Sequence, residues 1–239
     1  MCIIIYKKPQ INLPSQTVLN NCWNNNPDGA GILVHRKSDP ERLLISKGYM
    51  TKEKYYDYIK TLNLTKDDLI IYHFRIGTSG GLVPEKTHPF PISEDIEALN
   101  RTGTFYSTSA FIHNGVFGEG SINLSDTQLY IKDELVQYMK ISELDVRKFI
   151  ISRTAKKCRT ITISLAENFI FTTGEWVKDH NGLYFSNSTY KPKPRYEYPY
   201  FSEFYQNTVN YPTKVAERKL TKEEVKRPPL HITKCNFFK

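Results

Sequence analysis

The chain has 239 residues, of which 39% are hydrophobic and 24% charged, proportions that favour a buried core and argue against wholesale disorder. Lysine and arginine total 33 against 25 acidic residues, so the formal net charge is +8 and an anionic partner has to be considered. No hydrophobic run approaches the roughly 18–20 residues that a membrane span needs, which excludes a membrane-spanning segment.

The excess positive charge is concentrated at the C-terminal end. Residues 190–239 hold 11 basic and 5 acidic side chains and 6 of the 13 prolines, whereas residues 1–189 hold 22 basic and 20 acidic side chains. We therefore expect a nearly neutral domain over residues 1–189 and a basic extension rich in Pro, Tyr and Lys over 190–239. The extension is expected to pack on the domain or on a partner, with nucleic-acid binding as the less favoured alternative.

The cysteines indicate the compartment. Cys2, Cys22, Cys158 and Cys235 lie far apart without a CxxC pair, which argues against a zinc site, any other metal site or a disulfide framework. A reduced, cytoplasmic compartment follows, and residues 1–8 do not resemble a secretory signal. Nothing in the sequence calls for a cofactor.

The first half of the chain predicts alternating strands and helices. A run of β-branched residues at 2–6 predicts a buried strand, and Ser15 is a good N-cap for a helix over 15–23. Further strands are expected at 30–35, 43–46 and 69–74, with a helix at 51–62 between the last two.

The second half predicts helices followed by strands. Residues 110–112 form a strand that stops at an Asn-Gly turn, and Ser125 with Gln128 forms a capping box for a helix reaching about residue 138. A helix at 142–156 and a meander of strands at 160–165, 168–172 and 183–186 follow. Hairpins, then helices, then more strands indicate an α+β layered domain with mostly antiparallel sheets.

Cys2 is the residue with the clearest chemical potential. Removal of Met1 is easy before a small side chain and would leave a thiol and a free α-amine on the same residue. The amine, with a pKa near 8, can accept the thiol proton, so one residue supplies nucleophile and base. The alternative is a buried cysteine at a strand start with no chemical role.

Several further motifs accompany Cys2 along the chain. They are Asn26-Pro27-Asp28-Gly29-Ala30-Gly31-Ile32, His73-Phe74-Arg75-Ile76-Gly77-Thr78, His88-Pro89-Phe90, His113-Asn114-Gly115 and Ser125-Asp126-Thr127. In this order the sequence resembles the class II glutamine amidotransferases, which are N-terminal-nucleophile hydrolases. The resemblance implies a four-layer αββα sandwich, with Gly182-Leu183-Tyr184-Phe185-Ser186 as a late strand, and an irregular C-terminal extension.

The resemblance also assigns roles to individual residues. Cys2 would attack the side-chain amide of L-glutamine, and Asn114 and Gly115 would form the oxyanion hole. Arg75 would bind the substrate α-carboxylate and Asp126 its α-ammonium. The alternatives are an ordinary Asn-Gly turn, a surface ion pair of Arg75, and an Asp126 that only favours a helix N-terminus.

Other residues of these motifs are expected around the substrate. The resemblance places Thr78 in contact with it, while Asp28, His73 and His88 would brace the pocket. Three departures from the family pattern, Ile3, Ile76 and Ser79, affect the substrate side of the pocket and leave the nucleophile and oxyanion groups unchanged.

Fewer than 60 residues follow the hydrolase-like region, too few for the synthase domain of well-known family members. The expectation is therefore a stand-alone glutaminase that passes ammonia to a separate synthetase or ligase, of the kind found in bacteriophage and bacteria. Two alternatives remain: an N-terminal-cysteine amidase or acylase acting on another amide, and a non-catalytic binding module on the same fold. The sequence does not decide whether the protein forms homo-oligomers.

Overall fold

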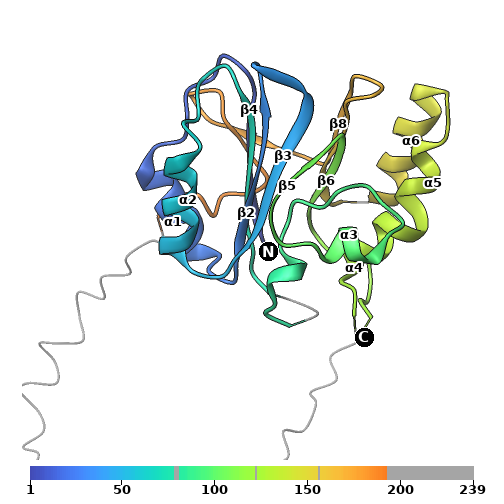
Figure 1. Ribbon diagram of the computed structural model, residues 1–239, viewed down its shortest axis with the longest axis horizontal. Helices are drawn as coiled ribbons and strands as arrows, with labels where there is room; N and C mark the ends of the chain where they lie inside the picture. Colours follow the sequence, from blue (N-terminus) through green and yellow to red (C-terminus); the bar gives the residue numbers. More distant parts are fainter. Residues whose placement is uncertain (78–80, 122, 156, 193–239) are drawn as a thin grey trace, which may run out of the picture. The chain divides into compact units, whose positions relative to one another are not determined.

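The computed structural model describes residues 1–77, 81–121, 123–155 and 157–192. Helices and antiparallel strands are mixed along the chain, which confirms the α+β class (Figure 1). The predicted extension lies outside the described residues from position 193 onward, and its boundary after residue 189 stays a prediction.

The larger sheet contains seven strands within the described residues, in the order β5-β3-β2-β4-β1-β10-β9. Their bounds are β1 Ile3–Lys7, β2 Ala30–Arg36, β3 Asp39–Tyr49, β4 Leu69–Phe74, β5 Gly103–Ser107, β9 Val177–Lys178 and β10 Tyr184–Phe185. All five residues of β1 are buried, because this strand lies in the interior of the sheet between β4 and β10. The strands expected around residues 2–6, 30–35, 43–46 and 69–74 are confirmed, and the short edge strands β5 and β9 were not predicted.

The smaller sheet has the order β6-β7-β8, with bounds β6 Ser109–Asn114, β7 Arg159–Ser164 and β8 Phe169–Thr173. The predicted meander of three late strands is only half right. β7 and β8 pair as expected, but β10 leaves this sheet and pairs with β1, aligning Phe185 with Ile5 and Tyr184 with Tyr6. The buried strand β1 needs a hydrogen-bonding neighbour on its second side, and β10 supplies it.

The four predicted helices are present, one of them with an interruption, while η1 and α3 were not predicted. Their bounds are α1 Gln16–Asn25, α2 Lys52–Thr61, η1 Pro84–Lys86, α3 Ile96–Asn100, α4 Asp126–Tyr130, η2 Ile131–Leu135, α5 Val136–Met139 and α6 Leu144–Ala155. Ser15 caps α1 by accepting from Val18 N, and the capping box of Ser125 and Gln128 is present at α4. The helix predicted to reach residue 138 contains a π-helical turn, η2. Within the described part of the chain, no helix combines the length and apolar character needed to cross a bilayer.

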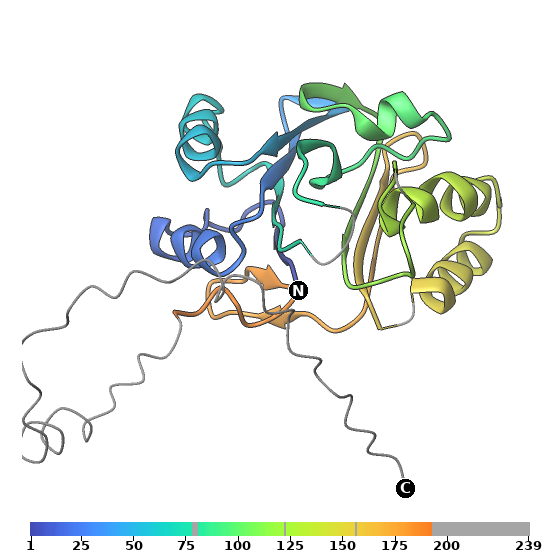
Figure 2. The same ribbon diagram turned by 90° about the horizontal axis from the view of Figure 1, so that it is seen from below.

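Three apolar clusters define how the elements are layered. The first packs α1 and α2, through residues such as Trp23 and Tyr55, on one face of the larger sheet. The second lies between the two sheets and includes Ile4 of β1 and Ile112 of β6. The third packs α4–α6 on the outer face of the smaller sheet, around Phe111. Figures 1 and 2 show the helices on both outer faces of the pair of sheets.

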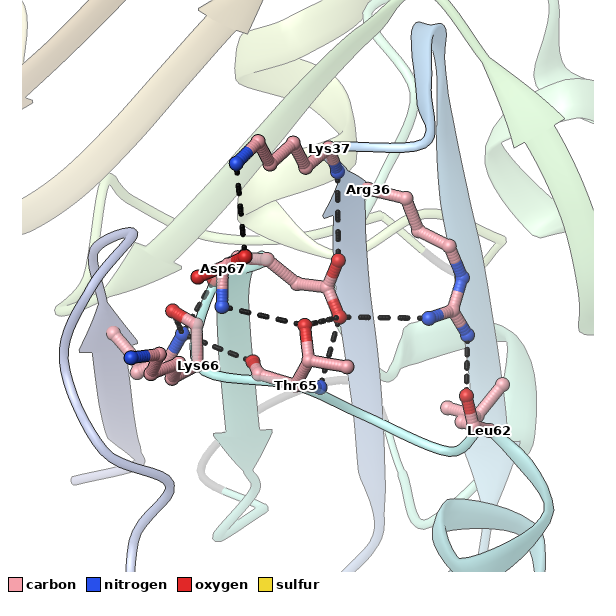
Figure 3. Close-up of polar contacts among 8 residues, drawn as sticks. Arg36, Lys37, Leu62, Thr65, Lys66 and Asp67 are labelled. Atoms are coloured by element: carbon pink, nitrogen blue, oxygen red, sulfur yellow. Dashed lines mark hydrogen bonds and ion pairs between the residues drawn. The ribbon is translucent and has the colours of Figure 1, made fainter.

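A polar network that includes Arg36, Leu62 and Thr65 fixes the loop before β4 (Figure 3), and through Lys7 it also anchors the end of β1 that is remote from Cys2. The buried Lys7 ammonium donates to the backbone oxygens of Thr65 at 3.2 Å, Lys66 at 2.5 Å and Asp68 at 2.6 Å. Burial lowers the pKa of Lys7, against the opposing effect of Asp68. Arg36 pairs with Asp68 and donates to the carbonyl of Leu62, so the loop before β4 is fixed against both β1 and β2.

Candidate functional site

A small, partly open cavity lies where the N-terminus meets the ends of β4 and β6 and the start of α4. Its volume is about 40 Å³, room for a few water molecules. The cavity is lined by Cys2, Arg75, Ile76, Lys86, His88, His113, Gly115, Ser125, Asp126 and Thr127. Five of the residues selected from the sequence therefore meet at one place: Cys2, Arg75, His88, Gly115 and Asp126.

Cys2 is half-buried and is held by one contact of its side chain and one of its backbone. The thiol approaches the carbonyl oxygen of Ile76 at 3.7 Å, and the Asn187 side chain donates to the Cys2 carbonyl at 2.6 Å. Burial raises the pKa of the Cys2 thiol. The contact with Ile76, the Arg75 charge and the ammonium of Met1 lower this pKa. A nearby base is therefore needed to generate the thiolate at neutral pH.

Arg75 follows the last residue of β4 and is held by the turn that precedes β2. Its N–H donates to Gly29 O at 2.7 Å, and its carbonyl accepts from Asp28 N at 3.0 Å. The guanidinium donates to Gly81 O at 2.8 Å. Asp28 does not line the cavity, but its carboxylate accepts from Gly77 N at 2.8 Å, a contact suited to the bracing role expected of it.

The two predicted oxyanion residues are placed differently. Gly115 lines the cavity, and a Cβ there would meet Cys158 Sγ at 2.4 Å and His113 Nε2 at 2.9 Å, so the backbone approaches its neighbours too closely for a side chain. Asn114 is buried behind the cavity lining, and its Nδ2 donates to Ser186 Oγ at 2.8 Å. The structure thus brings the Gly115 backbone to the cavity and turns the Asn114 amide toward Ser186.

Asp126 is the first residue of α4 and lines the cavity. One carboxylate oxygen accepts from Phe117 N and the other from Thr127 N, both at 2.8 Å. The Thr127 contact is of the kind expected for an acidic residue at a helix N-terminus. The Phe117 contact also ties the carboxylate to the loop after β6, which fixes it beside the cavity.

Three buried imidazoles, those of His73, His88 and His113, lie side by side at this site. The rings of His73 and His88 lie 4.3 Å apart, and those of His88 and His113 6.2 Å apart. Burial lowers the pKa of His73 to about 3 and that of His113 to about 4, and it lowers the pKa of His88 well below its usual value. All three are neutral at pH 7, and of the three only His88 and His113 line the cavity.

Sequence reasoning missed several residues of the cavity lining. His113 was visible as part of its motif but received no role, although its Nδ1 lies 2.9 Å from Thr127 Oγ1. Lys86 is buried in η1, and nothing in its polar surroundings along the chain signalled this. Thr78, expected to contact substrate, lies outside the described residues.

Over the described ranges no cluster of three or more His, Cys, Asp or Glu side chains is arranged to hold a metal ion. Comparison with protein-family models and with curated proteins finds no match to this chain.

Proposed function

We propose that the protein is a glutamine-hydrolysing amidotransferase subunit that uses Cys2, freed by removal of Met1, as its nucleophile. The observation that carries the proposal is the convergence of Cys2, Arg75, Gly115 and Asp126 on one cavity, from four separate segments. A thiol flanked by a cation, an anion and a backbone N–H suits an amide substrate that carries both an α-carboxylate and an α-ammonium.

The chemistry follows from this arrangement. The free amine of Cys2 accepts the thiol proton, and the thiolate attacks the carboxamide carbon of glutamine. The Gly115 N–H and the Asn114 amide stabilise the negative oxygen that develops. The carbon–nitrogen bond then breaks, the ammonium of Cys2 returns the proton to the leaving nitrogen, and ammonia departs. Water hydrolyses the resulting thioester to glutamate and regenerates the thiol.

The proposal extends to the fold and the partner. The layering of α1 and α2, two antiparallel sheets and α4–α6 supports an αββα sandwich of the N-terminal-nucleophile type. Arg75 and Asp126 favour a small zwitterionic substrate over an apolar acyl chain, which would need neither charge. The ammonia would be consumed by a separate synthetase or ligase.

The test combines processing, labelling and turnover. Intact mass should show that Met1 is absent, and a diazoketone analogue of glutamine should add once, at Cys2. Release of glutamate from L-glutamine should be lost in Cys2→Ala. Cys22→Ala is the matched control, because this thiol is fully buried in α1, away from the cavity. Retention of Met1, or labelling elsewhere, would contradict the proposal.

Substrate variants separate the alternatives. Arg75→Met and Asp126→Asn should each raise KM for glutamine strongly, because each removes one charge partner of the amino acid. If both variants hydrolyse glutamine as the unchanged protein does, an acylase with another amide substrate becomes the better explanation. Absence of any Cys2-dependent hydrolysis would favour a non-catalytic binding module.

A further inference from the structure

Ser186 occupies an unusual position at the end of β10. Its backbone N–H donates to Ile4 O at 3.1 Å, as the next step of the β1–β10 ladder requires. The return bond is different, because Ile4 N donates at 2.9 Å to the Ser186 hydroxyl oxygen in place of a backbone carbonyl. The hydroxyl thus ends the ladder, and the chain is released from the sheet immediately beyond it.

The same hydroxyl oxygen also accepts from Asn114 Nδ2 at 2.8 Å. Ser186 and Asn114 are both 1% exposed. Within the described residues, Asn114 Oδ1 has no hydrogen-bond partner, so the bond to Ser186 sets the orientation of the amide. Ser186 therefore joins the strand that begins beside Cys2 to the strand that ends beside Gly115.

The segment that follows Ser186 is itself anchored. Asn187 donates to the Cys2 carbonyl at 2.6 Å, and its Oδ1 accepts from Thr189 N at 2.9 Å. Asn25, the last residue of α1, donates to Thr189 O at 2.6 Å. These bonds hold the backbone after β10 in place, so the Ser186 hydroxyl is a rigid reference point.

We infer that Ser186 is a positioning residue that sets the Asn114 amide, and through it the oxyanion hole, relative to Cys2. The catalytic part of this inference rests on the proposed function. Ser186 engages one amide hydrogen of Asn114, and in the proposed function the second amide hydrogen donates to the developing oxyanion. Since oxyanion stabilisation depends on a donor that is already oriented, loss of the hydroxyl should weaken the transition state more than substrate binding.

The experiment compares Ser186→Ala with Ser46→Ala. Ser46 is an equally buried serine whose hydroxyl lies 2.7 Å from Tyr49 Oη and 2.8 Å from Thr104 Oγ1, and it does not line the cavity. The first readout is the side-chain amide resonance pair of Asn114, assigned by its disappearance in Asn114→Ala. Ser186→Ala should shift both resonances and Ser46→Ala should leave them in place. Ser186→Cys, which keeps nearly the same volume with a poorer acceptor, serves if the alanine variant does not fold.

The second readout is glutamine hydrolysis. Ser186→Ala should lower kcat by about tenfold or more with little change in KM, short of the roughly 100–1,000-fold expected when an oxyanion donor itself is removed. In the Asn114→Ala background the same change should lower kcat less than about twofold, because the residue through which it acts is gone.

The outcomes separate the two proposals. Unmoved Asn114 resonances, or equal kcat losses with and without Asn114, would overturn the positioning role. If the unchanged protein does not hydrolyse glutamine, the proposed function fails and the catalytic meaning of Ser186 fails with it. Shifted resonances would then still establish that Ser186 holds the Asn114 amide.

Discussion

Acid should destabilise the protein through the buried imidazole of His73. This side chain is 0% exposed in β4, and it lies in register with Ile4 on one side and Gly31 on the other. Burial lowers its pKa to about 3, and the nearby Arg75 charge acts in the same direction. An imidazole in the unfolded chain has a pKa of about 6.5.

Between these two pKa values the unfolded chain binds a proton at this residue that the folded chain does not. The free energy of unfolding therefore falls by about 1.4 kcal/mol for each pH unit in that window. The stability is fully present above about pH 6.5 and is lost as the pH falls toward 3. Between pH 7 and pH 5, His73 alone should account for about 2 kcal/mol, and His88 and His113 act with the same sign.

Urea unfolding at pH 7 and at pH 5 gives the free energy of unfolding at each pH, and the difference between the two values is compared from one variant to the next. In His73→Leu the difference should be about 2 kcal/mol smaller than in the unchanged protein, whatever the absolute stability of the variant. His73→Asn serves if the leucine variant does not fold. His35→Gln, which removes a half-buried imidazole from β2, is the control for losing one histidine. A His73 variant that keeps the full pH difference would refute the reasoning.

Three other substitutions test buried contacts, one of them at the site and two elsewhere in the fold. Lys7→Met leaves three backbone carbonyls without their ammonium donor, so urea titration should show a loss of about 1–3 kcal/mol, and unchanged stability would contradict the anchoring role. Arg147→Met removes the ion pair between a buried guanidinium and the partly exposed Glu167, and should lower the free energy of unfolding by about 2–3 kcal/mol, with a smaller loss in Glu167→Gln; equal losses would refute this. Gly115→Ala places a methyl group 2.4 Å from Cys158 Sγ and should cost about 1–3 kcal/mol in thermal or urea unfolding; adding Cys158→Ala should recover part of it, and no recovery would show that the strain lies elsewhere.

The sequence predicted correctly those helix starts and strands that are specified by residues close together along the chain. Ser15 before an apolar helix face predicted the start of α1, and Ser125 with Gln128 predicted the start of α4, because a cap involves residues only three positions apart. The buried strand β1 was visible as a run of β-branched residues. The π-helical turn η2 was not, since its composition is that of an ordinary amphipathic helix.

The burial of charged residues could not be predicted from their neighbours in the sequence. Lys47 lies in β3 with its ammonium 2.9 Å from Glu85 O, 3.1 Å from Leu99 O and 3.8 Å from the centre of the Phe90 ring. Burial lowers its pKa well below the usual value. These partners come from segments distant in sequence, so an alternating polar position in a strand could only be predicted as exposed.

The sequence by itself determined the net charge and its concentration near the C-terminal end, the chemical types available to the site, and the helix caps. It also supported the proposal that Cys2 is a nucleophile, because the residue follows Met1 directly. Only the tertiary structure decided that Cys2, Arg75, Gly115 and Asp126 meet at one cavity and that Asn114 turns toward Ser186. The physical reason is separation along the chain. The bonds of Ser186 join residues 182 and 72 positions apart, and such contacts depend on which strands pair, a choice made by burial of whole sheet faces.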